Sequence, residues 1–169
     1  MDFKGLGVAM ITPFTNEGKV DYPAIPLIVE NITTGRADYI VLMGTTAESS
    51  CLSSQEKNEI IQIVVRANKK RLPLVIGIGG NNTAKVVEEI QNTNLSYFQA
   101  ILSVSPYYNK PTQEGIYQHY KKIANASLLP IIVYNVPSRT GTNINVNTFV
   151  RLSTDFENII AIKEASGEM

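Results

Sequence analysis

Lys163 is the side chain of this sequence best placed for covalent chemistry. It directly follows the apolar residues 159–162, which have the composition of a strand buried on both faces of a parallel sheet. In an α/β barrel the carboxyl ends of such strands hold the reacting groups, and a partly buried lysine there can form an imine with a carbonyl compound. On this segment alone, a solvated lysine that ends a strand is the simpler interpretation.

Three other apolar runs also end in residues suited to chemistry or substrate binding. Gly-Thr-Thr-Ala-Glu-Ser (44–49) follows the second run, Ser-Pro-Tyr-Tyr-Asn-Lys-Pro (105–111) follows the fourth, and Tyr-Asn-Val-Pro-Ser-Arg-Thr-Gly (134–141) closes the fifth. Each has an ordinary structural explanation, because hydroxyls cap helices, tyrosines pack and Pro-Ser-Arg-Thr-Gly favours a turn. A parallel barrel would bring all four segments to one mouth, which favours a shared site.

Together these side chains suit an imine mechanism. A protonated imine is an electron sink, so a neighbouring C–H becomes acidic and its carbon can attack an aldehyde. That sequence needs a proton carrier, and Tyr134, Thr45 and Tyr108 offer a chain of hydroxyls. Arg139 offers a bidentate grip on a carboxylate.

The elements that must position these residues follow from the apolar pattern. Apolar runs predict strands at 7–11, 39–43, 74–78, 100–104, 131–134 and 159–162, with five helical patterns between them. Helix start signals include a capping box at 53–56, and further candidate caps are Asp21, Asn82 or Thr83, and Asn145 or Asn147. The order strand–helix, repeated five times before a sixth strand, predicts an α/β fold with parallel strands.

Two architectures satisfy that order: an open doubly wound sheet and part of a TIM (β/α)8 barrel. An open dinucleotide fold has a glycine-rich turn after its first strand, where this chain has Thr-Pro-Phe at 12–14. The glycines at 77–80 do not match that fingerprint either. A complete barrel needs about 250 residues. We therefore expect residues 1–169 to be the N-terminal part of one barrel domain, with about six strands and five helices, truncated after strand 6.

The amino-acid composition argues against several classes of binding partner. The 15 basic and 15 acidic residues cancel, so nothing suggests an electrostatic grip on nucleic acid or on a membrane surface. The longest apolar runs are far shorter than a membrane span. A single cysteine, Cys51, has no partner for an intrachain disulfide and fits a cytoplasmic protein. One histidine and one cysteine make a metal site improbable.

The four segments resemble those of the dihydrodipicolinate synthase family, and the resemblance extends over essentially the whole chain. This family belongs to the pyruvate-dependent class I aldolase superfamily, which also contains N-acetylneuraminate lyase. Gly44-Thr45-Thr46 with Glu48, and the sixth-strand lysine, identify only the superfamily. The segments 105–111 and 134–141 resemble the synthase branch much more closely. Arg139 is the best discriminator, since the sialic-acid branch lacks an arginine there.

The resemblance implies a lyase of lysine and diaminopimelate biosynthesis. Such an enzyme condenses pyruvate with L-aspartate 4-semialdehyde to give 4-hydroxy-tetrahydrodipicolinate, with no cofactor beyond the covalent imine. By resemblance, Lys163 forms the Schiff base with pyruvate and Tyr134 is the general acid/base. Thr45 and Tyr108 would complete a proton relay.

Substrate binding and assembly are also implied by resemblance. Thr46 would bind the pyruvate carboxylate, and Arg139 would hold the carboxylate of the semialdehyde. Family members usually form tetramers of tight dimers, in which the tyrosine matching Tyr107 or Tyr108 crosses into the neighbouring active site. We therefore expect a homo-oligomer, and poor activity from a monomer or from the 169 residues alone.

This chain departs from the lysine-inhibited members of the family at two positions near the dimer interface. Lysine-inhibited members resemble it at three positions near the dimer interface, which are Ser49, Asn81 and Tyr107. However, Lys57 and Lys85 stand where such members tend to have histidine and glutamate. A cationic ligand would meet like charge, so we predict weak or absent inhibition.

Two other functions fit parts of the pattern. The imine former could serve a different aldehyde, as in N-acetylneuraminate lyase or a 2-keto-3-deoxy sugar acid aldolase. Alternatively, the chain could be a non-catalytic α/β binding module whose rim residues are ordinary caps and turns. Borohydride reduction in the presence of pyruvate separates these classes, because only an imine former gains an adduct on Lys163.

Overall fold

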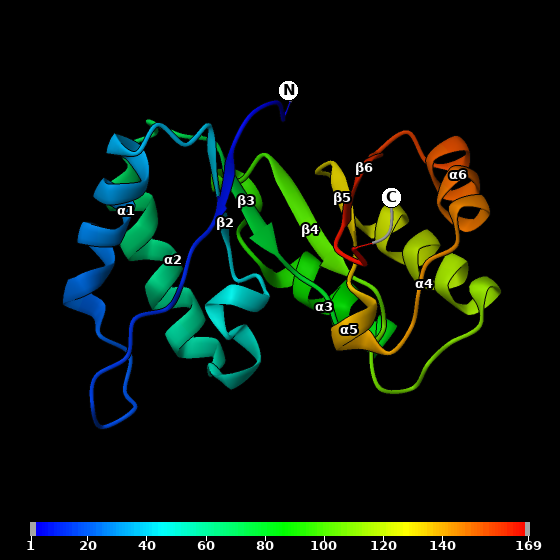
Figure 1. Cartoon of the computed structure of the whole chain (residues 1–169), viewed down its shortest axis with the longest axis horizontal. Coiled ribbons are helices and arrows are strands. Elements are labelled where there is room, and N and C mark those ends of the chain that lie inside the picture. The colour runs from blue at the N-terminus through cyan, green and yellow to red at the C-terminus, as the bar shows by residue number, and fades with distance from the viewer. Residues whose placement is uncertain (1–2, 168–169) are drawn as a thin grey trace. The chain divides into compact units, whose positions relative to one another are not determined.

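A computed structural model describes residues 3–167 of the chain (Figure 1). Strands and helices alternate along it in the predicted order. They are β1 (Gly7–Ala9), α1 (Ile25–Thr34), β2 (Tyr39–Leu42), α2 (Ser54–Asn68), β3 (Leu74–Gly77), α3 (Thr83–Asn92), β4 (Ala100–Val104), α4 (Gln113–Ala126), β5 (Ile131–Asn135), α5 (Pro137–Thr140), α6 (Val146–Asp155) and β6 (Ile159–Glu164). Short 3-10 helices are η1 (Tyr22–Ala24), η2 (Thr45–Ala47), η3 (Ser49–Cys51) and η4 (Leu95–Tyr97).

The chain divides into two compact units. The first spans Met1–Ile76 with Tyr97–Gln99, and the second spans Gly77–Ser96 with Ala100–Met169. That residues 1–169 are part of one domain stays a prediction.

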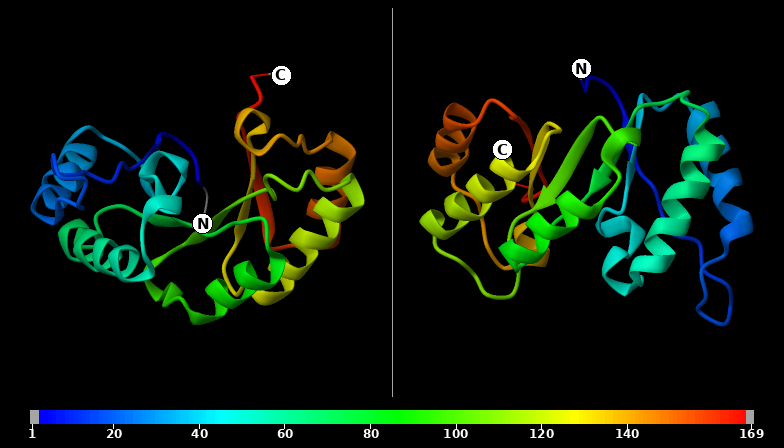
Figure 2. Two further views of the ribbon diagram at one scale, coloured as in Figure 1. Left: turned by 90° about the horizontal axis from the view of Figure 1, so that it is seen from below. Right: turned by 180° about the vertical axis from the view of Figure 1, so that it is seen from behind.

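In the first unit, β1 pairs with β2 and β2 pairs with β3, and both pairs are parallel. Helices α1 and α2 lie side by side, as two views show (Figures 1 and 2). Their apolar faces supply the core: Ile25 and Val29 come from α1, and Ile60 and Val64 come from α2. Burying side chains of this size supplies about 1.5–3 kcal/mol each.

In the second unit, β4 pairs with β5 and β5 pairs with β6, again in parallel. Every residue of β5 is buried, which explains the unbroken apolar run at residues 131–134 in the sequence. Helix α4 packs against both α3 and α6. Its Tyr120 is fully buried, and the hydroxyl donates a 2.9 Å hydrogen bond to the Ser103 carbonyl of β4.

The pairing of β5 with β6 contains one irregularity. Ile131 pairs with Ile159, but the next residue, Ile132, pairs with Ala161, so the register skips Ile160. Beyond this shift the pairing is regular to the ends of both strands. A bulge of this kind is frequent beside functional sites.

Several local predictions are confirmed. The strand at 100–104 has the predicted bounds, and the other strands differ by one to two residues at an end. Ser53 and Glu56 form a complete capping box: the Glu56 N–H donates to Ser53 Oγ, and the Ser53 N–H donates to Glu56 Oε2. Asn82 caps α3 by accepting hydrogen bonds from Ala84 and Lys85.

Other local predictions need correction. Asp21 caps the short helix η1 and not α1 itself, and Pro26 lies in the first turn of α1, where its missing N–H costs nothing. Asn145 precedes α6 but makes no side-chain cap. The segment 137–140, expected to be a turn, forms the one-turn helix α5. Within residues 3–167, no helix is long and apolar enough to span a bilayer.

Candidate active site

Tyr134 and Lys163 lie opposite each other on neighbouring parallel strands. Their Cα atoms are register partners near the carboxyl ends of β5 and β6. Because partners in register project to the same face of a sheet, their side chains share one face. The Lys163 Nζ atom lies 4.2 Å from the centroid of the Tyr134 ring, which is a cation–π contact. The structure therefore brings together the predicted imine former and the predicted general acid/base.

The surroundings of the two side chains differ. Tyr134 is buried, whereas Lys163 is exposed within the part of the chain that the structure describes. Lys163 is exposed because, among the strands of residues 3–167, β6 pairs with β5 alone, and half of the residues of β6 are exposed. Partial burial of the amine in the protein to which this chain belongs stays a prediction.

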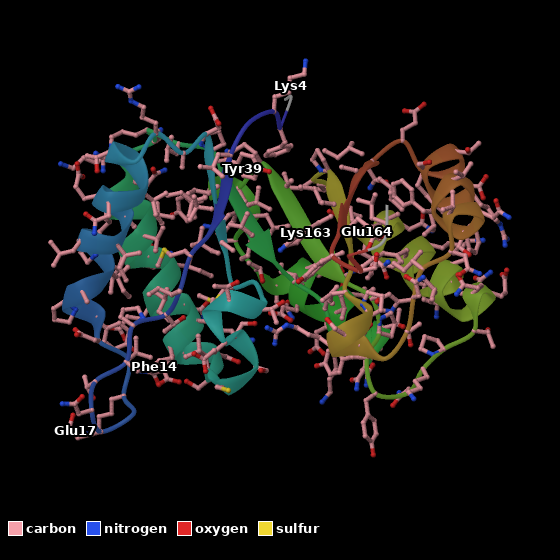
Figure 3. All side chains as sticks on the ribbon, viewed as in Figure 1. Lys4, Phe14, Glu17, Tyr39, Lys163 and Glu164 are labelled. Carbon is pink, nitrogen blue, oxygen red and sulfur yellow. The ribbon has the colours of Figure 1, made fainter. Side chains whose placement is uncertain are left out.

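Asn135 and Glu164 form a second pair, one residue further along the same two strands. They are also register partners, so they share the face opposite to Tyr134 and Lys163. Figure 3 shows the labelled Lys163 and Glu164 on opposite sides of β6. The Asn135 amide donates to both carboxylate oxygens of Glu164, at 3.1 and 2.8 Å. Sequence reasoning missed this pair, although both residues flank predicted site residues.

The Glu164 carboxylate is held in its ionised form. Partial burial by itself would raise its pKa, but hydrogen bonds from the Asn135 amide and from the backbone of Ser166 outweigh that effect. The net result is a pKa for Glu164 below its usual range. The carboxylate therefore stays an acceptor for its N–H donors at neutral pH.

Arg139 and Tyr108 lie on two loops of the second unit that meet each other. Arg139 is exposed on α5, and Gly141, which directly follows this helix, has a left-handed backbone conformation (φ 69°). A Cβ atom on Gly141 would lie 3.1 Å from the side chain of Lys110, so the loop that carries Tyr108 packs against this turn. The Tyr108 side chain is 86% exposed and its φ is 71°. Within residues 3–167, no hydrogen bond joins Tyr108 to Tyr134.

Thr45 and Thr46 belong to the first unit. Both are exposed on the short helix η2, at the carboxyl end of β2. Met43 before this helix and Glu48 after it have left-handed backbone conformations, with φ of 54° and 52°. Residues other than glycine seldom adopt such backbone conformations, which cost about 1–3 kcal/mol each and cluster at functional sites.

Thr12 holds this turn in place. Its buried hydroxyl donates a 2.7 Å hydrogen bond to the carbonyl of Ala47, the last residue of η2. Sequence reasoning used residues 12–14 only to argue against a glycine-rich turn, and it missed this contact. Nothing in the local sequence around Thr12 indicates a partner so far along the chain.

The described residues also limit other chemistry. Between residues 3 and 167, no group of three or more histidine, cysteine, aspartate or glutamate side chains is gathered as metal ligands. An open hollow of about 550 Å³ lies at the back of β6, lined by residues 143–147, Glu164 and Ser166. Lys163 and Tyr134 face away from this hollow, so it is not the site of the lysine.

Comparisons with known proteins give the class of fold and then the family. Crystal structures of dihydrodipicolinate synthases match the chain with TM-scores above 0.9, so its six strands and their helices have the fold of a partial TIM barrel. A model of the dihydrodipicolinate synthetase family matches residues 2–169. The chain belongs to this family.

Individual relatives agree with that assignment. The 4-hydroxy-tetrahydrodipicolinate synthase of Flavobacterium psychrophilum is 56% identical over 167 residues, which is 99% of this chain and 57% of the relative. The chain thus spans little more than half the length of this curated relative. A chloride-inhibited dihydrodipicolinate synthase from Acinetobacter baumannii, solved in complex with pyruvate, is 42% identical with a TM-score of 0.94, covering 99% of this chain and 57% of that one.

A third relative was solved with a different ligand. The dihydrodipicolinate synthase of Cyanidioschyzon merolae, solved with lysine bound, is 36% identical with a TM-score of 0.90. The match covers 97% of this chain and 56% of that one.

Proposed function

We propose that the protein to which this chain belongs is a lyase that condenses pyruvate with L-aspartate 4-semialdehyde to 4-hydroxy-tetrahydrodipicolinate, in lysine biosynthesis. The observation that carries this proposal is the contact between Lys163 and Tyr134, which lie opposite each other at the carboxyl ends of β5 and β6. Synthases of this name are about half identical to the chain over nearly all of it. No cofactor is needed, because the covalent imine itself activates the keto acid.

The first half of the reaction prepares a carbon nucleophile. The neutral Lys163 amine attacks the keto carbon of pyruvate, and loss of water leaves a protonated imine. A proton then leaves the methyl group, and its electron pair forms the C=C bond of an enamine. Tyr134 is the proposed carrier of these protons, since its ring lies beside Nζ, with Thr45 and Tyr108 as relay partners.

The second half forms the carbon–carbon bond. The enamine attacks the aldehyde carbon of the semialdehyde, whose oxygen takes up a proton. The amino group of the product then attacks the imine carbon and releases the Lys163 amine as the ring closes. Thr46 is proposed to bind the pyruvate carboxylate, and Arg139 to hold that of the semialdehyde through its planar guanidinium.

A second copy of the protein is the proposed partner. The resemblance implies that a tyrosine, Tyr107 or Tyr108, reaches into a neighbouring subunit, and the 86% exposure of the Tyr108 side chain supports such a role. We propose a homo-oligomer built as a tetramer of tight dimers, located in the cytoplasm. No nucleic acid or membrane has a role in this proposal.

Borohydride trapping tests the proposed function. Pyruvate and sodium borohydride are added to the chain of residues 1–169, and to the same chain extended with the C-terminal part of the Flavobacterium psychrophilum relative that lies beyond the match. We expect the mass of one reduced pyruvate imine on a peptide containing Lys163, and none in the Lys163→Arg variant. The extended chain should consume L-aspartate 4-semialdehyde in preference to N-acetylmannosamine or glyceraldehyde. Failure of the extended chain to trap pyruvate would refute the proposal.

A further inference from the structure

The face of the sheet behind the reactive pair is closely hydrogen-bonded. Asn135 is only 1% exposed, and its side chain is surrounded by partners. Its amide nitrogen donates to Asn143 Oδ1 at 2.7 Å and to the Glu164 carboxylate, and its Oδ1 accepts the Ile144 N–H at 3.0 Å. A backbone N–H can only donate, so this last bond fixes which end of the Asn135 amide is oxygen. Every hydrogen-bonding group of the side chain thus has a partner.

Glu164 is the hub on the β6 side. Its Oε1 accepts the Ser166 N–H at 2.7 Å. The Asn135 amide nitrogen donates to both Oε1 and Oε2, so the two oxygens share this donor. The carbonyl of Asn135 in turn accepts the Ala165 N–H at 2.9 Å. The chain that follows Lys163 is therefore tied to β5 directly at Glu164 and Ala165, and indirectly at Ser166.

The same network reaches the loop that follows α5. Gln113, at the start of α4, donates to the Asn143 carbonyl at 2.8 Å and accepts the Asn145 N–H at 3.0 Å. One set of hydrogen bonds thus joins the ends of β5 and β6 to residues 143–145. An apolar pair at 135 and 164 would fill the same space, but it would give no such directional connection.

Lysine needs such support because its own side chain is flexible. Four rotatable bonds separate Nζ from the backbone, so the position of the amine is only as well defined as the strand that carries it. Reacting atoms must be held within a fraction of an ångström of the productive geometry, and a displacement of about 1 Å costs about 10²-fold in rate. Within residues 3–167, Lys163 is exposed, and the contact that the structure gives its amine is the one with the Tyr134 ring.

We propose that Asn135 and Glu164 are positioning residues for Lys163: their hydrogen bonds hold the end of β6 so that the amine stays beside the Tyr134 ring. This inference rests on the proposed function and names the support of the same site. Neither Asn135 nor Glu164 is proposed to contact the substrate.

A double-mutant cycle tests the pair, using the extended chain described above. Asn135→Asp sets two carboxylates against each other, whereas Glu164→Gln replaces one of the two oxygens that accept from the Asn135 amide with an NH2 donor. The double variant restores a donor facing an acceptor between positions 135 and 164, because the new glutamine amide can donate to the new aspartate while its oxygen still accepts the Ser166 N–H. In both variants with aspartate at 135, the Asn143 amide must turn so that its nitrogen faces the new carboxylate. Asn158→Ala is the matched control, since it removes an asparagine amide at the other end of β6, 2.8 Å from the Ala124 carbonyl.

The main measurement is the rate of borohydride trapping at saturating pyruvate, together with the apparent Kd for pyruvate and the Tm. We expect Asn135→Asp to slow trapping by about 10- to 100-fold, with a smaller change in apparent Kd. The double variant should recover to within about threefold of the parent. Asn158→Ala should lower the Tm and leave the trapping rate unchanged. Hydrogen exchange at Ala165 and Ser166 should quicken in the two single variants only.

Each result decides between support and refutation. Equal trapping rates in parent and Asn135→Asp would overturn the positioning role. A trapping rate in Asn158→Ala that falls along with its Tm would overturn it too, because trapping would then follow stability alone. If Asn135→Asp does not fold, Glu164→Gln and the double variant give the same comparison. If the parent itself does not trap pyruvate, the proposed function fails, and this inference fails with it for that distinct reason.

Discussion

The two units hold their chemistry-bearing residues by different means. In the first, Thr45 and Thr46 lie in the turn η2, which is fixed by two left-handed residues and by one hydroxyl, that of Thr12. In the second, Lys163 stands on a strand whose back is fixed by a network of side chains centred on Asn135. One support is mostly backbone conformation, and the other is mostly side-chain hydrogen bonding.

This difference matches what each region is proposed to do. A turn that binds a carboxylate offers its own backbone N–H groups, so its backbone must be rigid. A lysine that forms a covalent bond needs a fixed point of attachment and a free amine. We therefore expect substitutions at the two supports to have different effects: changes at Thr12, which fixes the turn η2, should alter binding and stability, and changes at Asn135 and Glu164, which fix the end of β6, should alter reaction rate.

The largest expected effect comes from Tyr134. Replacement with phenylalanine keeps the ring beside Lys163 but removes the hydroxyl, so pyruvate should still be trapped while condensation slows by about 10²–10⁴-fold. Stopped-flow measurement of semialdehyde consumption by the extended chain gives the rate. Tyr117→Phe is a suitable control, because that hydroxyl contacts Asp155 on the helical side of the unit. Condensation at the parental rate in Tyr134→Phe would remove Tyr134 from the mechanism.

Acid should act on the second unit through His119, the only histidine of the chain. Burial lowers the pKa of its imidazole to about 4, while Nδ1 contacts Thr83 Oγ1 at 2.8 Å. In the unfolded chain the imidazole titrates near 6.5. Between these values the unfolded chain binds more protons, so stability falls as pH drops from about 6.5 to 4, by about 3 kcal/mol in total.

Urea denaturation across that pH window measures the effect. In His119→Phe the titrating group is gone, so the slope of unfolding free energy against pH should flatten between about pH 6.5 and 4. An unchanged slope would show that other groups govern acid unfolding. Hydrogen exchange should place the loss in helices α3 and α4, which carry Thr83 and His119.

A smaller effect is expected at Thr12 in the first unit. Thr12→Val keeps the shape but leaves the Ala47 carbonyl without its 2.7 Å donor, at a cost of about 1–3 kcal/mol. Thr33→Val is the matched control: it removes a hydroxyl bonded to the Val29 carbonyl within α1, which should cost less because of its partial exposure. Chemical denaturation of both variants gives the difference. Pyruvate affinity should weaken in Thr12→Val, whereas equal affinity would separate this hydrogen bond from binding.

The smallest effect concerns lysine as a ligand. We expect weak or absent inhibition of the extended chain, because Lys57 and Lys85 carry the same charge as the ligand. The double variant Lys57→His, Lys85→Glu should be inhibited at a lower lysine concentration than the parent. Micromolar inhibition of the parent would contradict the electrostatic argument.

Much of the fold follows from the sequence, because the apolar runs are largely buried and the longer helices have a periodic apolar face. The capping box at Ser53 and the cap at Asn82 are local signals, and they mark the starts of α2 and α3 correctly. At the start of α6 the Asn145 side chain makes no cap, and Gln113, 32 residues away, binds the Asn145 N–H instead. Local signals therefore predict local contacts, and distant partners can replace them.

The candidate site was predictable only in part. Lys163 and Tyr134 stand out as reactive residues that follow apolar runs, and the structure places them together. Asn135, Glu164 and Thr12 carry no such mark, since their importance lies mainly in partners between 8 and 35 residues distant. The exposure of Lys163 within residues 3–167 agrees with the simpler interpretation of its segment, a solvated lysine that ends a strand.

The skipped residue in β6 has a consequence for where the nucleophile points. Side chains of a regular strand alternate, so counting in twos from Ile159 would set Lys163 on the side of Ile131, Val133 and Asn135. The single unpaired isoleucine reverses that parity, and the amine turns toward the phenol. A residue with no reactive group thus decides which face of the sheet carries the Lys163 side chain. If the apolar run were placed in another sheet without its irregularity, the lysine side chain would point to the opposite face.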